Sequence, residues 1–341
     1  MATLTQASRE LFRRNADERF STLAALSDHC RQQKAASLDR WHPPQQLKAV
    51  DRGGELLLAA GSDGEFRLNE WSFTQLCNLA RITKDTVNRL STPTASQVFA
   101  ETLPLSGKPM QLLTTENQLR SVHGAAYTRL WNADLVSLIS EFAVDFTPPQ
   151  EGGGGGTGLY CGEQDLFCFL IDPTGWAEIG GQAFAPGFFV WNSEVGKRSV
   201  GVSTFWFQKV CANHIVWDAT EVVEVSRKHT AGVGHALADI RRTLETLVAK
   251  RDARRDGFVR VMEKAMSERL GSDAEETLTQ LLKNGIPKGL AKQALEIARQ
   301  QGGFTIFSLV DALTRIAGQQ VNAGDRLDID ARAAQLLVLA A

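Results

Sequence analysis

The sequence has no long hydrophobic run and few residues that cross-link a chain. Its 341 residues include five cysteines, ten prolines and two tyrosines. The longest apolar stretches, such as residues 336–341, are far shorter than the roughly 18–20 residues that a membrane helix needs. The first residues carry charges and lack the apolar core of a signal peptide. We therefore expect a cytoplasmic protein that has no membrane partner.

The cysteine count and the net charge exclude further classes. Five cysteines form no even set of pairs, and a chain of this length does not need disulfides for stability. The formal net charge of −2 excludes a protein that coats nucleic acid with its whole surface, but it leaves room for a local basic groove. The composition, 43% hydrophobic and 22% charged, is that of a soluble globular protein.

The patterning predicts an α+β protein in three parts. We expect an N-terminal helical segment (residues 1–40), an α+β core (41–270) and a small C-terminal helical subdomain (271–341). The core is predicted as an antiparallel β-meander packed by helices, one of them long and basic. Its strands are expected at residues 55–60, 65–69, 110–122, 159–171, 188–191, 200–210 and 214–218. Prolines and a run of five glycines mark residues 148–158 as a loop.

Helices are predicted from apolar spacing and from capping residues. Two short helices are expected at residues 72–80 and 83–90, but the second has too few base-reading side chains for a helix-turn-helix. A third is expected at 132–142, and a long one runs from about 234 to 270, with Gly257 as a possible interruption. The C-terminal helices are placed near residues 274–284, 287–300, 305–319 and 329–339, with caps at Ser272 and Asp328.

Searches for catalytic or cofactor chemistry find little. Residues 196–199 contain a Gly-Lys pair but lack the first glycine and the hydroxyl of a phosphate loop, so no cofactor is predicted. A zinc site could draw on the ligands Cys161, Cys168, Cys211 and His214, but no close cysteine pair exists, and buried structural cysteines are the favoured interpretation. We predict no metal.

A nucleophile set is also conceivable. Ser193, Glu194 and His214 supply a hydroxyl, a carboxylate and an imidazole, which defines a hydrolase hypothesis. Ser193 is not in a strained Gly-x-Ser-x-Gly elbow, so a turn with bonded polar side chains is the favoured interpretation. The protein is predicted to be non-enzymatic.

Charge distribution carries more information. Residues 227–264 hold ten Lys or Arg and five acids, a net +5, while the rest of the chain is −7. A basic helix beside an aromatic sheet suits single-stranded nucleic acid, with cations on phosphates and aromatic rings on bases. The alternative is a solvated helix with internal ion pairs. The predicted contacts are Lys197, Arg198, Arg227, Lys228, Arg241, Arg242, Arg251, Arg254 and Arg255, with Trp191 and Trp206 as stacking rings.

Several blocks resemble the phage/plasmid-like protein family with domain of unknown function 932. Residues 118–132 are similar to its "Arg-x-Val … Tyr … Leu-x-Asn" block, and residues 190–196 and 210–217 are similar to its Asn-Ser-Glu-Val-Gly and "Cys-x-Asn-x-Ile-x-Trp" blocks. Residues 305–314 resemble the closing helix. The family pattern differs at residues 124–126, at His214 and at Asp311. The resemblance marks a polar cluster of Arg120, Tyr127, Asn192, Ser193, Glu194, Cys211 and Asn213.

The resemblance implies a role in the DNA metabolism of a mobile element, a phage or a plasmid. The predicted meander and basic helix are also similar to single-strand annealing proteins, which is an analogy of fold. Under this hypothesis the protein binds single-stranded DNA without sequence preference, anneals it and assembles into homo-oligomers. Two alternatives stay open: a protein-binding or regulatory module acting on a host factor, and the hydrolase described above.

Overall fold

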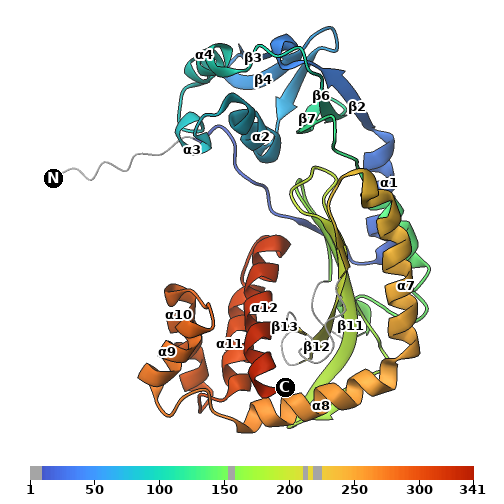
Figure 1. The fold of residues 1–341 in the computed structure, drawn as a ribbon, viewed down its shortest axis with the longest axis vertical. Coiled ribbons are helices and arrows are strands. Elements are labelled where there is room, and N and C mark those ends of the chain that lie inside the picture. Colours follow the sequence, from blue (N-terminus) through green and yellow to red (C-terminus); the bar gives the residue numbers. More distant parts are fainter. Residues whose placement is uncertain (1–9, 153–157, 210–213, 218–224) are drawn as a thin grey trace, which may run out of the picture.

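The computed structural model contains two β-sheets, one above the other in Figure 1, with helices packed on each. The structure describes residues 10–152, 158–209, 214–217 and 225–341, and at 152, 214–217 and 251–255 it describes the backbone alone. The sheets are largely antiparallel and the C-terminal part is helical, so the predicted α+β class is confirmed.

The first sheet lies within residues 37–124 and has the strand order β2-β6-β7-β5-β4-β3. Its strands are β2 (Ser37–His42), β3 (Leu47–Arg52), β4 (Glu55–Ala60), β5 (Glu65–Leu68), β6 (Met110–Thr115) and β7 (Gln118–Gly124), with a 3₁₀ turn η1 (Pro44–Gln46) before β3. Neighbours are antiparallel except β5 and β7, which are parallel. The strands predicted at residues 55–60 and 65–69 form the hairpin β4–β5, and the strands predicted within residues 110–122 form the pair β6–β7.

Helices α2 (Glu70–Ala80), α3 (Lys84–Val87) and α4 (Thr92–Thr102) belong to the same region. Alternate residues of β4 are buried in one core with Phe73 of α2 and Phe99 of α4. The helix predicted from residue 72, with Ser72 as its cap, begins two residues earlier: Asn69 is the N-cap, and Ser72 is its partner in a capping box. α3 is one turn long and ends before the predicted Leu90.

The second sheet contains the most strand-like part of the sequence. Its order is β1-β8-β9-β11-β12-β13, with β10 on β11 and β14 on β12. The strands are β1 (Glu18–Arg19), β8 (Leu159–Cys161), β9 (Leu166–Ile171), β10 (Ala177–Ile179), β11 (Gln182–Asn192), β12 (Val200–Gln208), β13 (His214–Trp217) and β14 (Val225–Arg227). Before it lie α5 (Asn132–Ser140) and the turn α6 (Pro149–Gly152), and residues 153–157 of the predicted loop lie outside the described residues.

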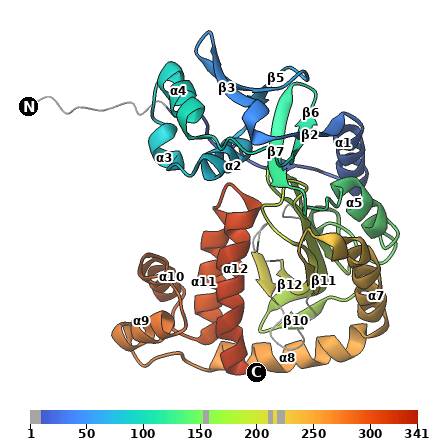
Figure 2. The same ribbon diagram turned by 45° about the horizontal axis from the view of Figure 1, so that its top comes forward.

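Helices cover both faces of this second sheet, which explains its continuous apolar runs. One face packs on α1 (Leu23–Ala35), α5 and α7 (Ala236–Ala249), and the other packs on α12 (Ala323–Leu337). Figures 1 and 2 show β11 and β12 between α7 on one side and α11 and α12 on the other. Every residue of β9 is buried as a result.

The predicted long basic helix is two helices. After η2 (Ala231–His235), α7 ends at Ala249 and α8 (Arg251–Ser267) begins after a break at Lys250, where φ is −109° and ψ is 19°. Gly257, the predicted interruption, lies within α8. The break follows from packing: Leu244 of α7 belongs to the core on one face of the sheet, whereas Phe258 of α8 belongs to the core of the C-terminal helices.

The C-terminal helices are α9 (Ala274–Lys283), α10 (Lys288–Gln300), α11 (Ile306–Gly318) and α12, followed by η3 (Val338–Ala340). Four helices were predicted here, close to these bounds except for α12, which begins six residues before 329. The predicted caps are wrong by position: Asp273 caps α9 instead of Ser272, and Asp328 lies inside α12, which follows Asn322.

The prediction of a helical segment over residues 1–40 is wrong outside α1. Residues 10–22 contain no helix and β2 begins at Ser37; residues 1–9 lie outside the described residues. The backbone of Phe12 bonds to the Asn88 side chain at 2.7 and 2.8 Å, and Asp17 Oδ2 accepts from Ala323 N at 2.8 Å. These distant partners replace the hydrogen bonds of a local helix.

A search of the described helices finds none long and apolar enough to cross a bilayer.

Candidate functional site

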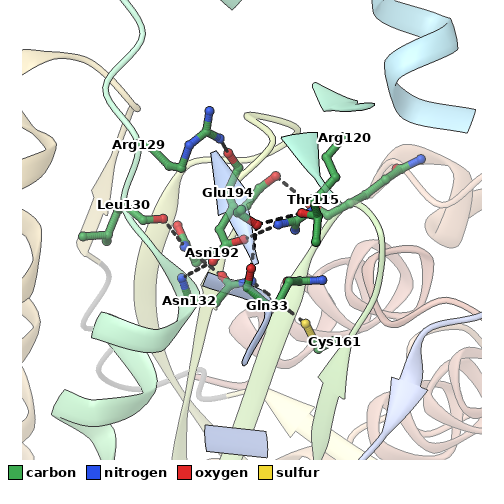
Figure 3. A network of polar contacts seen from close by, with 12 residues as sticks. Gln33, Thr115, Arg120, Arg129, Leu130, Asn132, Cys161, Asn192 and Glu194 are labelled. Carbon is green, nitrogen blue, oxygen red and sulfur yellow. Dashed lines mark hydrogen bonds and ion pairs between the residues drawn. The ribbon is translucent and has the colours of Figure 1, made fainter. Parts of the chain in front are cut away.

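Five of the seven residues of the predicted polar cluster meet where the two sheets join. Figure 3 shows three of them, Arg120, Asn192 and Glu194. Arg120 comes from β7 of the first sheet, Tyr127 from the segment after it, and Asn192, Ser193 and Glu194 from the end of β11 and the turn that follows. Cys211 and Asn213 lie outside the described residues.

The Glu194 carboxylate is bonded on both oxygens. Oε2 accepts from Arg120 Nη1 at 2.9 Å, and Oε1 accepts from the backbone N of Asn132, at the start of α5, at 2.6 Å. Arg120 is 4% exposed and Glu194 is 1% exposed. This buried ion pair and the hydrogen bond at the N-terminus of α5 hold the Glu194 carboxylate in place. Both carboxylate oxygens are occupied, which leaves little capacity for acid–base chemistry.

The backbone around Glu194 ties the sheets together. Its carbonyl oxygen accepts from Tyr127 Oη at 2.8 Å and from the Arg129 guanidinium. Arg129 Nη2 also donates to Asp39 Oδ1, on β2 of the first sheet, at 2.7 Å. Asn192 Nδ2 donates to Leu130 O and to the Asn132 side chain, both at 2.9 Å, as Figure 3 shows.

The hydroxyl of Ser193 is also committed. Oγ donates to Gln164 O at 2.6 Å and accepts from Lys197 N at 2.8 Å, and the residue is fully buried. With this hydroxyl buried and Glu194 paired with Arg120, the hydrolase hypothesis built on Ser193, Glu194 and His214 loses two of its three groups. The His214 side chain lies outside the described residues.

An aromatic stack covers the turn. The ring of Tyr127 lies 3.7 Å from that of His123 and 5.5 Å from that of His229, between centroids. Burial lowers the pKa of His123 to about 3 and that of His229 to about 4, and the nearby Arg129 charge contributes to both shifts. Both imidazoles are therefore neutral at pH 7.

Gly196 allows the turn to pass under this stack. Its φ is +73°, and a Cβ at this position would lie 2.6 Å from His123 Cε1 and 2.9 Å from Tyr127 Cε2. Only glycine fits both the backbone conformation and the close approach. The next residue, Lys197, then points away from the buried cluster toward a cleft.

The cleft has a volume of about 400 Å³ and lies between the N-terminal segment, α2, α3 and the 193–197 turn. Lys197 Nζ lies 4.8 Å from the centroid of the Trp71 ring, and Trp71 Nε1 donates to Val195 O at 2.8 Å. Among the described residues, no carboxylate pairs with Lys197. The cleft is lined by Glu10, Phe12, Arg13, Arg14, Glu70, Trp71, Thr74, Lys84, Asp85, Asn88, Gln164 and Lys197.

Several other charges in and beside the cleft form ion pairs. Glu70 pairs with Lys84 and accepts from Gln164 Nε2 at 2.6 Å. Arg14 Nη2 lies 3.3 Å from Asp17 Oδ1 and 3.6 Å from Asp165 Oδ2. Arg198 pairs with the same Asp165 at 3.4 Å, which places it beside the cleft. Burial raises the pKa of Asp165 to about 6 in spite of these cations.

The structure separates the predicted nucleic-acid contacts into two regions. Lys197 and Arg198 belong to the cleft region, but Arg227, Lys228, Arg241 and Arg242 lie on β14 and α7 or next to them. Arg227 and Arg242 both pair with Asp239, and Arg241 pairs with Glu141 at 2.6 Å. The side chains of Arg251, Arg254 and Arg255 lie outside the described residues.

The predicted stacking role of the two tryptophans is contradicted by their burial. Trp206 is fully buried and stacks on Phe258 at 4.0 Å between centroids. Trp191 is 8% exposed and stacks on Phe189 at 5.1 Å. Both rings are part of the core, because every residue of β12 and every residue of β11 from Phe184 to Asn192 is buried.

Within the described part of the chain, no group of three or more His, Cys, Asp or Glu is arranged to hold a metal ion. Of the four ligands considered for zinc, Cys161 and Cys168 are buried thiols, while Cys211 and the His214 side chain lie outside that part.

Comparison with known proteins adds no relative. No protein-family model matches the chain, and no curated protein or solved structure is detectably similar to it.

The sequence patterns missed four residues of the cleft, Trp71, Lys84, Arg13 and Arg14. These residues come from three separate segments and have no common spacing in the sequence. Function is therefore inferred from the cleft itself.

Proposed function

We propose that the protein binds single-stranded nucleic acid, without sequence preference, through the cleft beside Lys197. The observation that supports the proposal is a lysine that is positioned by a glycine turn, rests on an indole ring and has no carboxylate partner among the described residues. A fixed, uncompensated cation next to an aromatic ring suits a ligand that carries both phosphate and bases.

The size of the cleft favours one strand over a duplex. A volume of about 400 Å³ is in the range that holds a small organic molecule, of the order of one nucleotide. Lys197 and Arg13 are exposed cations of the lining, and Arg13 is paired with Glu10 at 2.6 Å. Glu10, Glu70 and Asp85 lie in the same lining, so the attraction is local and depends on where the strand enters. In this reading the protein is a non-enzymatic accessory factor of a mobile element, as its resemblance implies.

Fluorescence anisotropy with labelled single-stranded and double-stranded oligonucleotides across a salt series tests the proposal. We expect the affinity for the single strand to exceed that for the duplex and to fall linearly with log salt. Lys197→Ala removes one phosphate contact, so the affinity at low salt falls about tenfold and the salt slope by about 0.7.

Arg242→Ala is the matched control, because it removes one exposed cation from α7 that is not part of the cleft lining. We expect it to bind as the unmodified protein does. An effect of Arg242→Ala without an effect of Lys197→Ala would move the site to the α7 surface. No binding at low salt would contradict nucleic-acid binding altogether and favour the module that acts on a host factor.

A further inference from the structure

A second cavity lies at the other end of the second sheet from the cleft. It has a volume of about 340 Å³ and is formed by the start of β11, the end of β12 and helices α8 and α11. β11 has 11 residues, a length of roughly 33 Å, and its far end at Asn192 leads into the turn beside the cleft. Nucleic-acid binding through the cleft does not use this cavity, so the inference below stands independently of the proposed function.

A buried glutamine oxygen in this cavity has no partner. Gln208 is 1% exposed and lines the cavity, and its Oε1 forms no hydrogen bond with a described residue. It lies two positions after Trp206 on β12, so the two side chains share a face of the sheet, and the Trp206 ring stacks on Phe258 of α8. A buried acceptor that is left unbonded is costly. A molecule that brings an N–H donor to this oxygen is therefore favoured.

Gln208 is joined to a second glutamine of the lining. Its Nε2 donates to Oε1 of Gln182, at the start of β11. This bond leaves Gln208 Oε1, an acceptor, and Gln182 Nε2, a donor, as the open ends of the pair. Adenine presents the complementary pattern, because its exocyclic amine donates and the neighbouring ring nitrogen accepts.

A guanidinium also lines the cavity. Arg315 Nε donates to Asp311 Oδ2 at 2.9 Å, and its side chain is 36% exposed. No hydrogen bond joins its two Nη groups to a described residue, and paired N–H groups of this kind match the oxygens of a phosphate. Asp311 is the one carboxylate among the described residues of the lining, and Arg315 already pairs with it. The lining therefore favours an anionic group over an ammonium group.

The cavity runs along one side of α11 and has an apolar wall. Its lining follows this helix from the N-cap Thr305 to Arg315, a rise of roughly 15 Å. Phe307 of α11, 8% exposed, and Met266 of α8 supply the apolar contacts. Gly180 lets Met266 approach the β10–β11 turn, since a Cβ there would lie 2.6 Å from Met266 Sδ. A flat base joined to an anion suits this combination of an amide pair, an apolar wall and a guanidinium.

We propose that this cavity binds a free adenine mononucleotide. The exocyclic amine donates to Gln208 Oε1, the neighbouring ring nitrogen accepts from Gln182 Nε2, and the ring packs on Phe307 and Met266. The phosphate accepts from the Nη groups of Arg315. A volume of about 340 Å³ lies in the range of sites for small organic molecules.

Isothermal titration calorimetry of the full-length protein with adenosine 5′-monophosphate tests the proposal. We expect saturable binding that Gln208→Met, which keeps the side-chain length and removes the amide, weakens about tenfold. Purine riboside 5′-monophosphate lacks the exocyclic amine and should bind the unmodified protein about tenfold more weakly as well. The analogue and adenosine 5′-monophosphate should bind Gln208→Met equally, because the variant and the analogue remove the same contact.

The phosphate contact is tested separately with Arg315→Lys, which keeps the charge beside Asp311 but loses the paired N–H groups. We expect a weaker affinity for adenosine 5′-monophosphate and an unchanged affinity for adenosine, which has no phosphate. Gln300→Met is the control, because Gln300 is an exposed residue of α10 outside the lining, and it should bind the nucleotide as the unmodified protein does.

Three results would overturn the proposal. The first is no binding at about 1 mM nucleotide. The second is an affinity that Lys197→Ala lowers and Gln208→Met does not, which would place the nucleotide in the cleft. The third is displacement of the nucleotide from Lys197→Ala by an oligonucleotide of deoxyadenosine, which would assign the cavity to a base of a bound strand. Single-strand binding that depends on Lys197 is measured apart from these titrations, so the two proposals can fail separately.

Discussion

The two sides of the segment from Asn192 to Lys197 differ in how completely their polar groups are bonded. On the inner side, the Glu194 carboxylate bonds to Arg120 and to the backbone of Asn132, and the Ser193 hydroxyl bonds to the backbones of Gln164 and Lys197. On the outer side, the Lys197 ammonium faces a ring and an open cleft, with no carboxylate among the described residues paired to it.

This difference separates a structural role from a binding role within one short motif. A buried, fully bonded group stabilises the fold, and its loss costs stability. An exposed, unpaired charge contributes little to stability and is available for a ligand. We therefore expect substitutions on the inner side to unfold the protein and the substitution of Lys197 to affect binding alone.

The largest expected effect is that of Glu194→Gln. The substitution leaves the buried Arg120 without its counter-charge, which should lower the free energy of unfolding by about 3–5 kcal/mol in urea denaturation. Glu178→Gln, at an exposed position of β10, is the control and should cost less than about 0.5 kcal/mol. Equal stability of the two variants would show that the ion pair does not hold the sheets together.

Gly196→Ala comes next and has a natural control in Gly181→Ala. Both glycines have almost the same φ, +73° and +74°, but a Cβ would clash with His123 and Tyr127 only at 196. We expect Gly181→Ala to cost about 1 kcal/mol through backbone strain and Gly196→Ala about 2 kcal/mol more through overpacking. Equal losses in thermal or urea unfolding would contradict the tight packing of the turn under the aromatic stack.

The neutral imidazole of His229 predicts a smaller effect that depends on pH. The unfolded chain takes up this proton below pH 6.5, but the folded protein takes it up only near its pKa of about 4. Stability is therefore lost as pH falls through this window, by about 2 kcal/mol between pH 7 and pH 4.5.

His229→Gln should remove this share of the pH dependence, while the exposed His235→Gln should retain it. Burial raises the pKa of Glu163 to about 7 and of Asp165 to about 6, and these groups act in the opposite direction. The unmodified protein and His229→Gln both contain Glu163 and Asp165, so the contributions of these two groups cancel when the two pH dependences are compared. Parallel curves for His229→Gln and the unmodified protein would show that folding does not lower the pKa of His229.

The smallest stability effect is expected for Lys197→Ala, below about 0.5 kcal/mol, because no ion pair with a described residue is lost. The same variant should lose about tenfold in affinity for a single-stranded oligonucleotide. A large loss of stability would place Lys197 with the inner side and remove the main support for the cleft as a binding site.

The hairpins and most helices of the fold could be predicted from local patterns. The turn at residues 61–64 contains two glycines with positive φ, and in β4 buried residues alternate with more exposed ones. Local prediction failed where distant partners replace local ones. Asn88 and Ala323 bond to residues 12 and 17 and hold the N-terminal segment extended, although its apolar spacing is helical.

The candidate site also has one part that could be predicted from the sequence and one part that could not. The polar motif residues were marked by resemblance, and the structure brings the five that it describes together. The cleft could not be predicted, because Trp71, Lys84 and Arg13 come from segments that are adjacent only after both sheets have formed.

By itself the sequence determined the class of the fold, because hydrophobic periodicity and turn residues act between neighbours along the chain. It also determined that basic charge is concentrated in residues 227–264. The tertiary structure decided which charges are neutralised and which aromatic rings are buried. These properties depend on distances across the fold, and covering both faces of the second sheet buried Trp206 while the glycine turn left Lys197 exposed.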